Sequence, residues 1–171
     1  MHFFVLILAL LLTTGCTVNS VGETFDDSRN ESLAKKRVRE ANAELAKANI
    51  NVTSFDGIVL LTGQVSSADL IPIASAQVAP LRNVRKVHNE LTVAGKTSYL
   101  SRTNDSWLTT KVKSAMAAAE SADSNRIKVV TENGVVYLMG LVTREEADAA
   151  ADIARHIQGV QKIVKVFEYM N

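Results

Sequence analysis

The sequence predicts an α+β protein with two tandem units, each a two-layer α/β sandwich with the element order α-β-β-α-β. Three observations support this class. Residues 50–65 repeat as residues 127–142, with seven of 16 positions identical. Each copy has two apolar runs joined by Asp-Gly or Asn-Gly, which are strong hairpin signals. Amphipathic segments at helical spacing flank each hairpin.

The first unit is expected to begin with a helix over residues 32–46, followed by a hairpin over residues 50–65. Asp56-Gly57 would form its turn, because both central residues of a type I′ turn need positive φ. Gly63 is expected to close the second strand. A helix over residues 67–79 and an apolar strand over residues 84–93 complete the unit.

The second unit repeats this order, with helices expected over residues 106–119 and 144–157 and a last strand over residues 160–170. Asn133-Gly134 would form the hairpin turn, and Gly140 would close the second strand. This strand is apolar on both faces, and only one face can meet the two helices. The other face needs cover, which the first unit or another protein could provide.

The N-terminus predicts secretion. Residues 3–12 are an unbroken apolar run, too short for a membrane span of about 20 residues but suited to a signal peptide. Cys16, the only cysteine, follows this run and resembles the lipidated cysteine of bacterial lipoproteins. Thr17 stands where those lipoproteins carry an aspartate for inner-membrane retention, which favours the outer membrane. The alternative is a soluble periplasmic protein, cut elsewhere, with a buried free cysteine.

We therefore expect a lipoprotein signal peptide over residues 1–15, an N-terminal linker over 16–30 and a first domain over 31–94. A second linker over 95–102 and a second domain over 103–171 would follow.

Three stretches in the second unit carry a family resemblance: NDSWLTTKVKS (104–114), TENGVVYLMGLVT (131–143) and AAADIA (149–154). With the hairpin glycines, they resemble the BON domain. Two such domains behind a lipidated cysteine resemble the dual BON-domain outer-membrane lipoproteins of the DolP (YraP) family. This resemblance implies a non-enzymatic protein, lipid-anchored at the periplasmic face of the outer membrane.

The resemblance also implies a ligand and partners. Members bind anionic phospholipid, notably phosphatidylglycerol, through the first helix of the second domain. They gather at the division site, support envelope integrity and have been linked to the outer-membrane β-barrel assembly machinery.

Trp107, the only tryptophan, lies off the apolar stripe of the helix predicted over residues 106–119. With Val112 at the centre of the stripe, Trp107 falls about 140° away. Tryptophan favours the membrane–water interface, and each lysine near an anionic leaflet contributes about 1 kcal/mol. The predicted phospholipid-binding residues are Trp107, Lys111, Lys113, Ser114 and Ala118. The alternative is that Trp107 folds under the linker or against the first domain as a lid.

The first helix of the first unit offers a weaker candidate surface. Leu33 takes the place of the tryptophan there, and the run Lys35-Lys36-Arg37-Arg39 could also meet lipid. Glu40 and Glu44 interrupt this positive charge, which is more typical of a solvated helix face.

Composition argues against several other functions. The 19 basic and 18 acidic residues lack the basic excess of a nucleic-acid binder. His88 and His156 have no partner at a motif spacing, and no glycine-rich phosphate loop or metal-ligand cluster occurs. We therefore expect no catalytic, cofactor or metal site and no enzymatic activity. The rival function is a periplasmic protein–protein adaptor for an envelope assembly, in which lipid contact is incidental.

Overall fold

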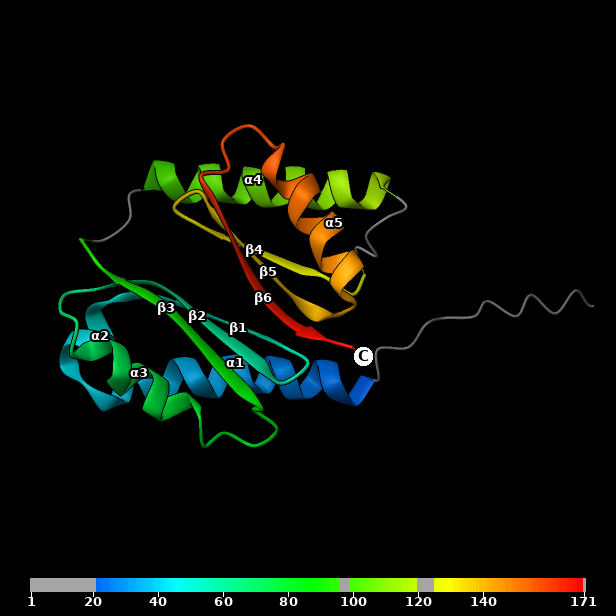
Figure 1. Cartoon of the computed structure of the whole chain (residues 1–171). Coiled ribbons are helices and arrows are strands. Elements are labelled where there is room, and N and C mark those ends of the chain that lie inside the picture. Colours follow the sequence, from blue (N-terminus) through cyan, green and yellow to red (C-terminus); the bar gives the residue numbers. More distant parts are fainter. Residues whose placement is uncertain (1–20, 96–98, 120–124, 171) are drawn as a thin grey trace, which may run out of the picture.

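The computed structural model describes residues 21–95, 99–119 and 125–170, which form two units of one fold (Figure 1). The first unit contains α1 (Val21–Ala41), α2 (Ala43–Lys47), β1 (Asn49–Phe55), β2 (Ile58–Val65), α3 (Leu70–Val78) and β3 (Lys86–Val93). The second contains α4 (Tyr99–Ala118), β4 (Lys128–Glu132), β5 (Val135–Val142), α5 (Arg144–Arg155) and β6 (Lys162–Tyr169). The predicted fold is confirmed, with α2 as an addition. Cys16 and the predicted signal peptide lie outside the described residues.

Each unit has a three-stranded sheet with the hairpin's second strand at its centre. β2 pairs antiparallel with β1 and parallel with β3, and β5 pairs in the same way with β4 and β6. Both central residues of each hairpin turn have positive φ: 50° at Asp56, 72° at Gly57, 49° at Asn133 and 74° at Gly134. The predicted turn chemistry is therefore confirmed.

The two other repeated glycines lie inside their strands and do not close them. β2 continues past Gly63 to Val65, and β5 continues past Gly140 to Val142. At Gly63, where φ is +120°, a Cβ atom would lie 2.0 Å from the carbonyl oxygen of Asn49. These positions exclude a side chain because the chain at the start of the preceding strand passes too close.

The first helix of each unit begins earlier than predicted. α1 begins at Val21 rather than near residue 32, and α4 begins at Tyr99 rather than near residue 106. These added turns carry few apolar residues, so hydrophobic spacing did not reveal them. α1 ends at Ala41 because Asn42 caps α2, its side chain accepting a hydrogen bond from the Glu44 backbone N–H at 2.7 Å.

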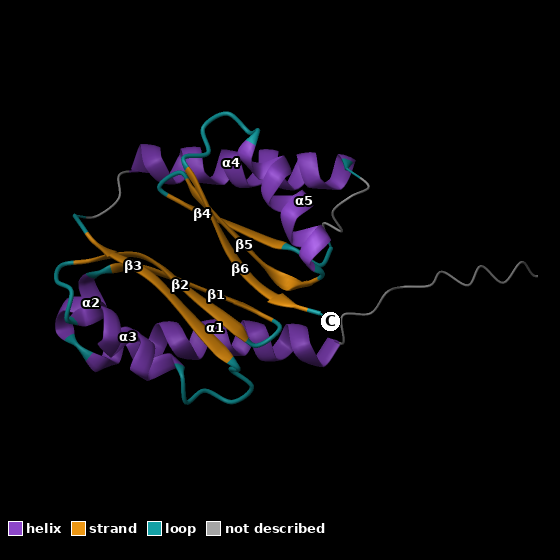
Figure 2. Ribbon diagram, viewed as in Figure 1, coloured by secondary structure: helices purple, strands orange, loops and turns teal. Residues whose placement is uncertain are grey.

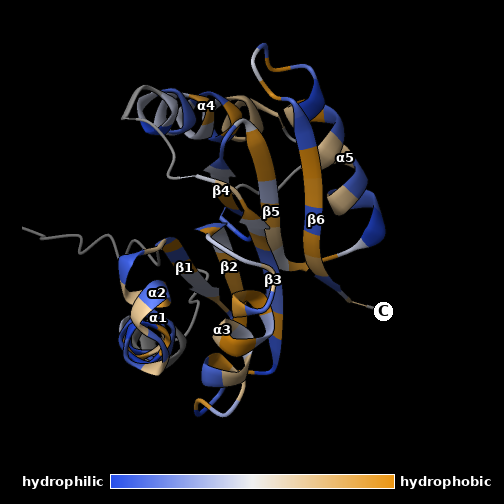
Figure 3. Cartoon of the chain, turned by 90° about the vertical axis from the view of Figure 1, so that its left-hand side faces the viewer, coloured by the Kyte–Doolittle hydropathy of each residue, from blue (hydrophilic) through white to orange (hydrophobic). Residues whose placement is uncertain are grey.

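Each sheet packs one face against its own helices, and this face forms the core of its unit. The first core includes Ala34, Val38, Val59, Leu61, Ala74, Val78 and Leu91. The second includes Val112, Met116, Val136, Leu138, Ala150 and Ala154. Figure 3 shows the central strands as largely hydrophobic between these layers.

The remaining faces of the two sheets pack against each other, so the layers run helix, sheet, sheet, helix (Figure 2). A third hydrophobic cluster joins the units through Ile58, Leu60, Tyr137, Met139 and Val166. The sequence required cover for the second face of the sheet, and the other unit supplies it.

A buried polar group sits within this junction. Glu132 accepts hydrogen bonds from the side-chain amides of Asn51 at 3.0 Å and Gln64 at 2.8 Å. Burial raises the pKa of Tyr137 to about 12, and the carboxylates of Glu90 and Glu132 add to that rise. The phenol therefore stays neutral, as its place in an apolar cluster requires.

Candidate functional site

α4 buries one stripe of side chains and leaves Trp107 outside it. Leu108, Val112 and Met116 follow one another at four-residue spacing and are at most 1% exposed. Trp107 is 50% exposed. The prediction that it lies off the core stripe is confirmed, and the alternative of a covered lid is wrong.

Polar contacts on the buried side of α4, across the helix from Trp107, fix the rotation of the helix about its axis. The Asp105 carboxylate accepts hydrogen bonds from the backbone N–H groups of Asn133 and Gly134, both at 2.8 Å. Four residues later, the Thr109 hydroxyl donates to Thr131 at 2.8 Å. These contacts tie α4 to the β4–β5 hairpin and so set the direction in which Trp107 points. The sequence analysis did not identify Asp105. Its only signal was a carboxylate in the helix that comes before the hairpin with the Asn-Gly turn.

The structure brings four of the five predicted residues together on the outward side of α4. Nζ of Lys111 lies 3.7 Å from the centroid of the Trp107 ring, and Ser114 and Ala118 are exposed along the same side. We call these four residues the α4 surface. Lys113 is exposed, but it lies six residues from Trp107, about 120° around the helix, and therefore flanks this surface.

The charges that α4 presents to solvent are positive. Arg102, Lys111 and Lys113 are its basic residues, whereas its only carboxylate, Asp105, is 5% exposed and hydrogen-bonded. The acidic residues of the neighbouring α5 are Glu145, Glu146, Asp148 and Asp152. Hydrogen bonding and charge from Lys165 lower the pKa of Asp148. α5 also carries Arg144 and Arg155 and is therefore net negative, whereas α4 is net positive, although the domain as a whole has no basic excess.

The first helix of the first domain contains the counterpart of Asp105, which corrects the predicted alignment. Asp27 accepts hydrogen bonds from the backbone N–H groups of the turn residues Asp56 and Gly57, at 2.8 and 3.2 Å. The position two residues after this aspartate, equivalent to Trp107, is therefore Arg29. Leu33 is equivalent to Lys111. The predicted alignment, which matched Leu33 with Trp107, was wrong by one helical turn, because helical spacing alone does not distinguish two alignments that differ by one turn.

The corresponding surface of α1 differs in chemistry and in direction. Arg29 pairs with Asp26 at 3.2 Å, and Lys36 with Glu40 at 3.9 Å. Leu33 is 38% exposed. α1 lies in the outer layer opposite α4 (Figure 1), so one flat membrane cannot contact both helices.

The two histidines of the described residues lie apart. His88, in β3, has its pKa lowered by burial and by Lys86, against a smaller opposing effect of Glu90. His156 is exposed after α5, with Nδ1 2.8 Å from the Asp152 carbonyl oxygen. No three metal-ligating side chains gather within the part of the chain that the structure describes. Of the described helices, none has the length and apolarity to cross a membrane.

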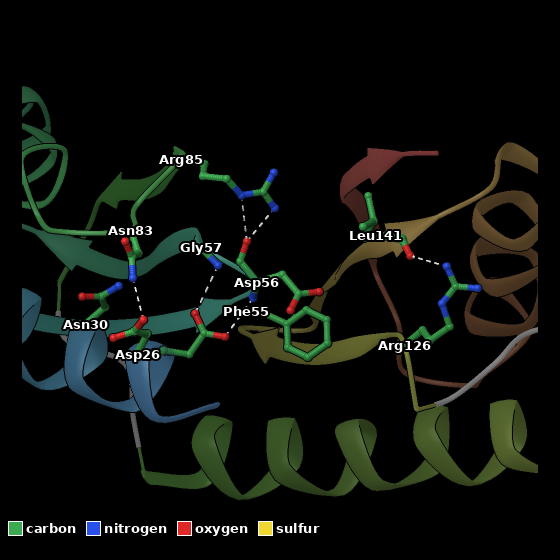
Figure 4. A pocket seen from close by; sticks show the side chains of 10 residues that line it. Asp26, Asn30, Phe55, Asp56, Gly57, Asn83, Arg85, Arg126 and Leu141 are labelled. Atoms are coloured by element: carbon green, nitrogen blue, oxygen red, sulfur yellow. Dashed lines mark hydrogen bonds between the residues drawn. The ribbon is translucent and has the colours of Figure 1, made fainter. Parts of the chain in front are cut away.

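A cavity of about 630 Å³ lies beside the junction of the two domains (Figure 4). Two arginines of its lining donate to backbone carbonyl oxygens, whereas the buried Oδ1 of Asn30 has no hydrogen-bond partner among the described residues. Arg85 donates to the Asp56 carbonyl oxygen at 2.6 Å and lies 2.5 Å from Glu168, and Arg126 donates to the Leu141 carbonyl oxygen at 2.9 Å. The ion pair between Arg85 and Glu168 links the two domains beside the cavity. Its lining is Asp26, Asp27, Asn30, Phe55, Asp56, Gly57, Asn83, Arg85, Arg126 and Leu141.

Comparison with known families identifies both domains. The model of the BON domain matches this chain twice, over residues 26–95 and 104–171. Both matches include most of the first helix and all of the hairpin, second helix and last strand of a unit.

Similar proteins extend over most of the chain. The outer membrane lipoprotein DolP of Haemophilus influenzae is 41% identical over 152 residues, which cover 89% of this chain and 79% of that protein. A 21 kDa hemolysin of Actinobacillus pleuropneumoniae is 35% identical, covering 88% of this chain and 78% of that protein. The osmotically inducible protein Y of Escherichia coli is 27% identical, covering 86% and 74%.

Proposed function

Because this chain belongs to the BON domain family and, within it, to the DolP outer-membrane lipoproteins, we propose that it binds anionic phospholipid through α4. The chain is a membrane-associated protein of the cell envelope. In the proposed function it is not an enzyme. It is anchored at Cys16, faces the periplasm, and supports envelope integrity at the division site.

The α4 surface supports this proposal. It combines a half-exposed tryptophan, a lysine stacked on the indole ring and small side chains at Ser114 and Ala118. An indole ring suits the head-group region, where its apolar body is buried and its N–H remains hydrated. Small neighbours allow the helix backbone to approach the bilayer closely.

Energetics favour a local, reversible contact. Burying an indole contributes about 2–3 kcal/mol, and each lysine near an anionic leaflet about 1 kcal/mol. These contributions are modest, but an acyl anchor at Cys16 would keep α4 beside the membrane and raise its effective concentration. Phosphatidylglycerol meets the requirement for an anionic head group.

The soluble form, residues 17–171, is expected to co-sediment with vesicles that contain phosphatidylglycerol and not with phosphatidylcholine vesicles. Lys111→Ala should weaken binding about 5-fold at low salt, because one favourable charge near the leaflet is lost. The difference should shrink as salt rises, since screening shortens the range of the charge. Lys36→Ala, on the opposite outer layer, serves as the matched control.

The same assay separates the proposal from the adaptor function. Equal binding to neutral and anionic vesicles, or no binding to either, would contradict the recognition of anionic phospholipid by α4. The protein would then be better described as an adaptor for an envelope assembly such as the outer-membrane β-barrel assembly machinery.

Cys16→Ser is expected to abolish acylation, because this residue supplies the only thiol in the chain. The protein should then be released into the periplasm or remain unprocessed. Metabolic labelling with a palmitate analogue, followed by membrane fractionation, measures both effects. Equal labelling of the wild type and the variant would exclude lipidation at this cysteine.

A further inference from the structure

The loop between α5 and β6, residues 156–161, lies beside α4. Figures 1 and 3 show this loop rising past α4 on the outer side of the second domain. At Gly159 an added Cβ atom would lie only 2.9 Å from Cδ2 of Leu108, so the loop backbone contacts α4. Leu108 directly follows Trp107 and lies about 100° around the helix from it, so the loop flanks α4 on the side next to the one that carries the exposed indole.

The loop is held firmly in this position. The backbone N–H of Val160 donates to the Ile157 carbonyl oxygen at 3.2 Å, and that of Gln161 donates to the Gly134 carbonyl oxygen at 2.9 Å. Ile157 and Val160 pack against the core of the second domain. The turn uses φ of +103° at Gly159. Gln158 and Gly159 remain exposed at its tip.

The charge around the loop suits an anionic partner. Residues 153–167 contain no aspartate or glutamate, and their basic residues are Arg155, Lys162 and Lys165. Arg155 pairs with Asp152 at 3.4 Å and Lys165 pairs with Asp148, both on α5, so Lys162 supplies the positive charge beside the loop. Lys162 is exposed immediately after the loop. An anionic surface can therefore approach the tip without meeting a carboxylate within this segment.

We propose that the α5–β6 loop is a second membrane contact, which enters the head-group region of an anionic phospholipid bilayer together with Trp107. This inference rests on the proposed function of α4. A domain that contacts a bilayer through one helix alone can rotate about the axis of that helix. A rigid loop at its side gives a second point of support and fixes the orientation of the domain.

The first domain offers an internal comparison. Its α3–β3 loop has the same hydrogen bonds: Val84 N–H to the Leu81 carbonyl oxygen at 3.2 Å, and Arg85 N–H to the Gly57 carbonyl oxygen at 2.8 Å. Arg82 is the exposed counterpart of Gln158. It belongs to the outer layer opposite α4 and should remain in water when α4 binds.

Site-specific fluorescence tests the loop directly. Gln158→Cys and Arg82→Cys are made separately in residues 17–171, where each introduces the only cysteine, and are labelled with an environment-sensitive fluorophore. With phosphatidylglycerol vesicles we expect a blue shift from the label at residue 158 and none from residue 82. Trp107, the only tryptophan, reports the contact of α4 in unlabelled protein.

An affinity measurement supports the fluorescence test. Gln158→Glu should weaken vesicle binding about 5-fold through repulsion by the lipid phosphates, whereas Arg82→Glu should not. Both variants should melt like the wild type, because both side chains are exposed.

Each outcome of the fluorescence test has one meaning. A silent label at residue 158 with a blue-shifted Trp107 would overturn the loop contact and leave the proposed function of α4 intact. Silence from both would overturn the proposed function itself. Equal shifts at residues 158 and 82 would mean adsorption without a fixed orientation, and this would also overturn the inference.

Discussion

Trp107→Glu is expected to lower the affinity for anionic vesicles by about 100-fold while the melting temperature changes little. The substitution removes about 2–3 kcal/mol of indole burial and adds a charge that the lipid phosphates repel. Folding should tolerate it, since Trp107 is 50% exposed and the stripe of Leu108, Val112 and Met116 is unchanged. Vesicle co-sedimentation and thermal melting of the same preparation measure the two effects.

Leu33→Glu provides the matched control. It also replaces an exposed apolar side chain in the first helix of a domain by a carboxylate, but this helix lies in the opposite outer layer. We expect unchanged lipid binding for this variant. If Leu33→Glu impaired binding and Trp107→Glu did not, the membrane surface would be α1 and its basic run. Unfolding caused by Trp107→Glu would instead mean that the indole supports the fold.

The second domain alone, residues 99–171, is expected to lose its cooperative melt or to self-associate. Separation exposes Tyr137, Met139 and Val166, which are at most 5% exposed in the intact protein. Burial of three such side chains contributes about 5–9 kcal/mol, comparable with the whole stability of a small domain. Glu132 would also lose the amide donors Asn51 and Gln64. Circular dichroism melting and analytical ultracentrifugation detect these losses.

The two-domain chain, residues 21–171, is the reference for this experiment and should melt in one transition. A monomeric second domain with a cooperative melt close to that of the reference would contradict the expectation. The two domains would then be independent units, and the cluster between the sheets would contribute little to stability.

The hairpins of both domains and the outward position of Trp107 were determined by the sequence alone. Turn residues and side-chain periodicity are local properties, which act within a few residues of the chain. Asp56-Gly57 and Asn133-Gly134 therefore predicted both hairpins, and the spacing around Val112 predicted which side of α4 is buried. The family resemblance added the expected ligand, which no spacing could supply.

Tertiary structure alone decided how these elements meet. The role of Asp27 and Asp105 is visible only in the folded structure, where each carboxylate binds the hairpin turn of its own domain. Aligning the two helices on these aspartates makes Arg29, and not Leu33, the residue equivalent to Trp107. The position of the α5–β6 loop beside Leu108 and the cover that each sheet gives the other also join residues distant in sequence. Such contacts depend on the fit of whole surfaces. An apolar strand face predicts that another surface covers it, but many surfaces of similar shape could do so. Only packing in three dimensions selects one of them.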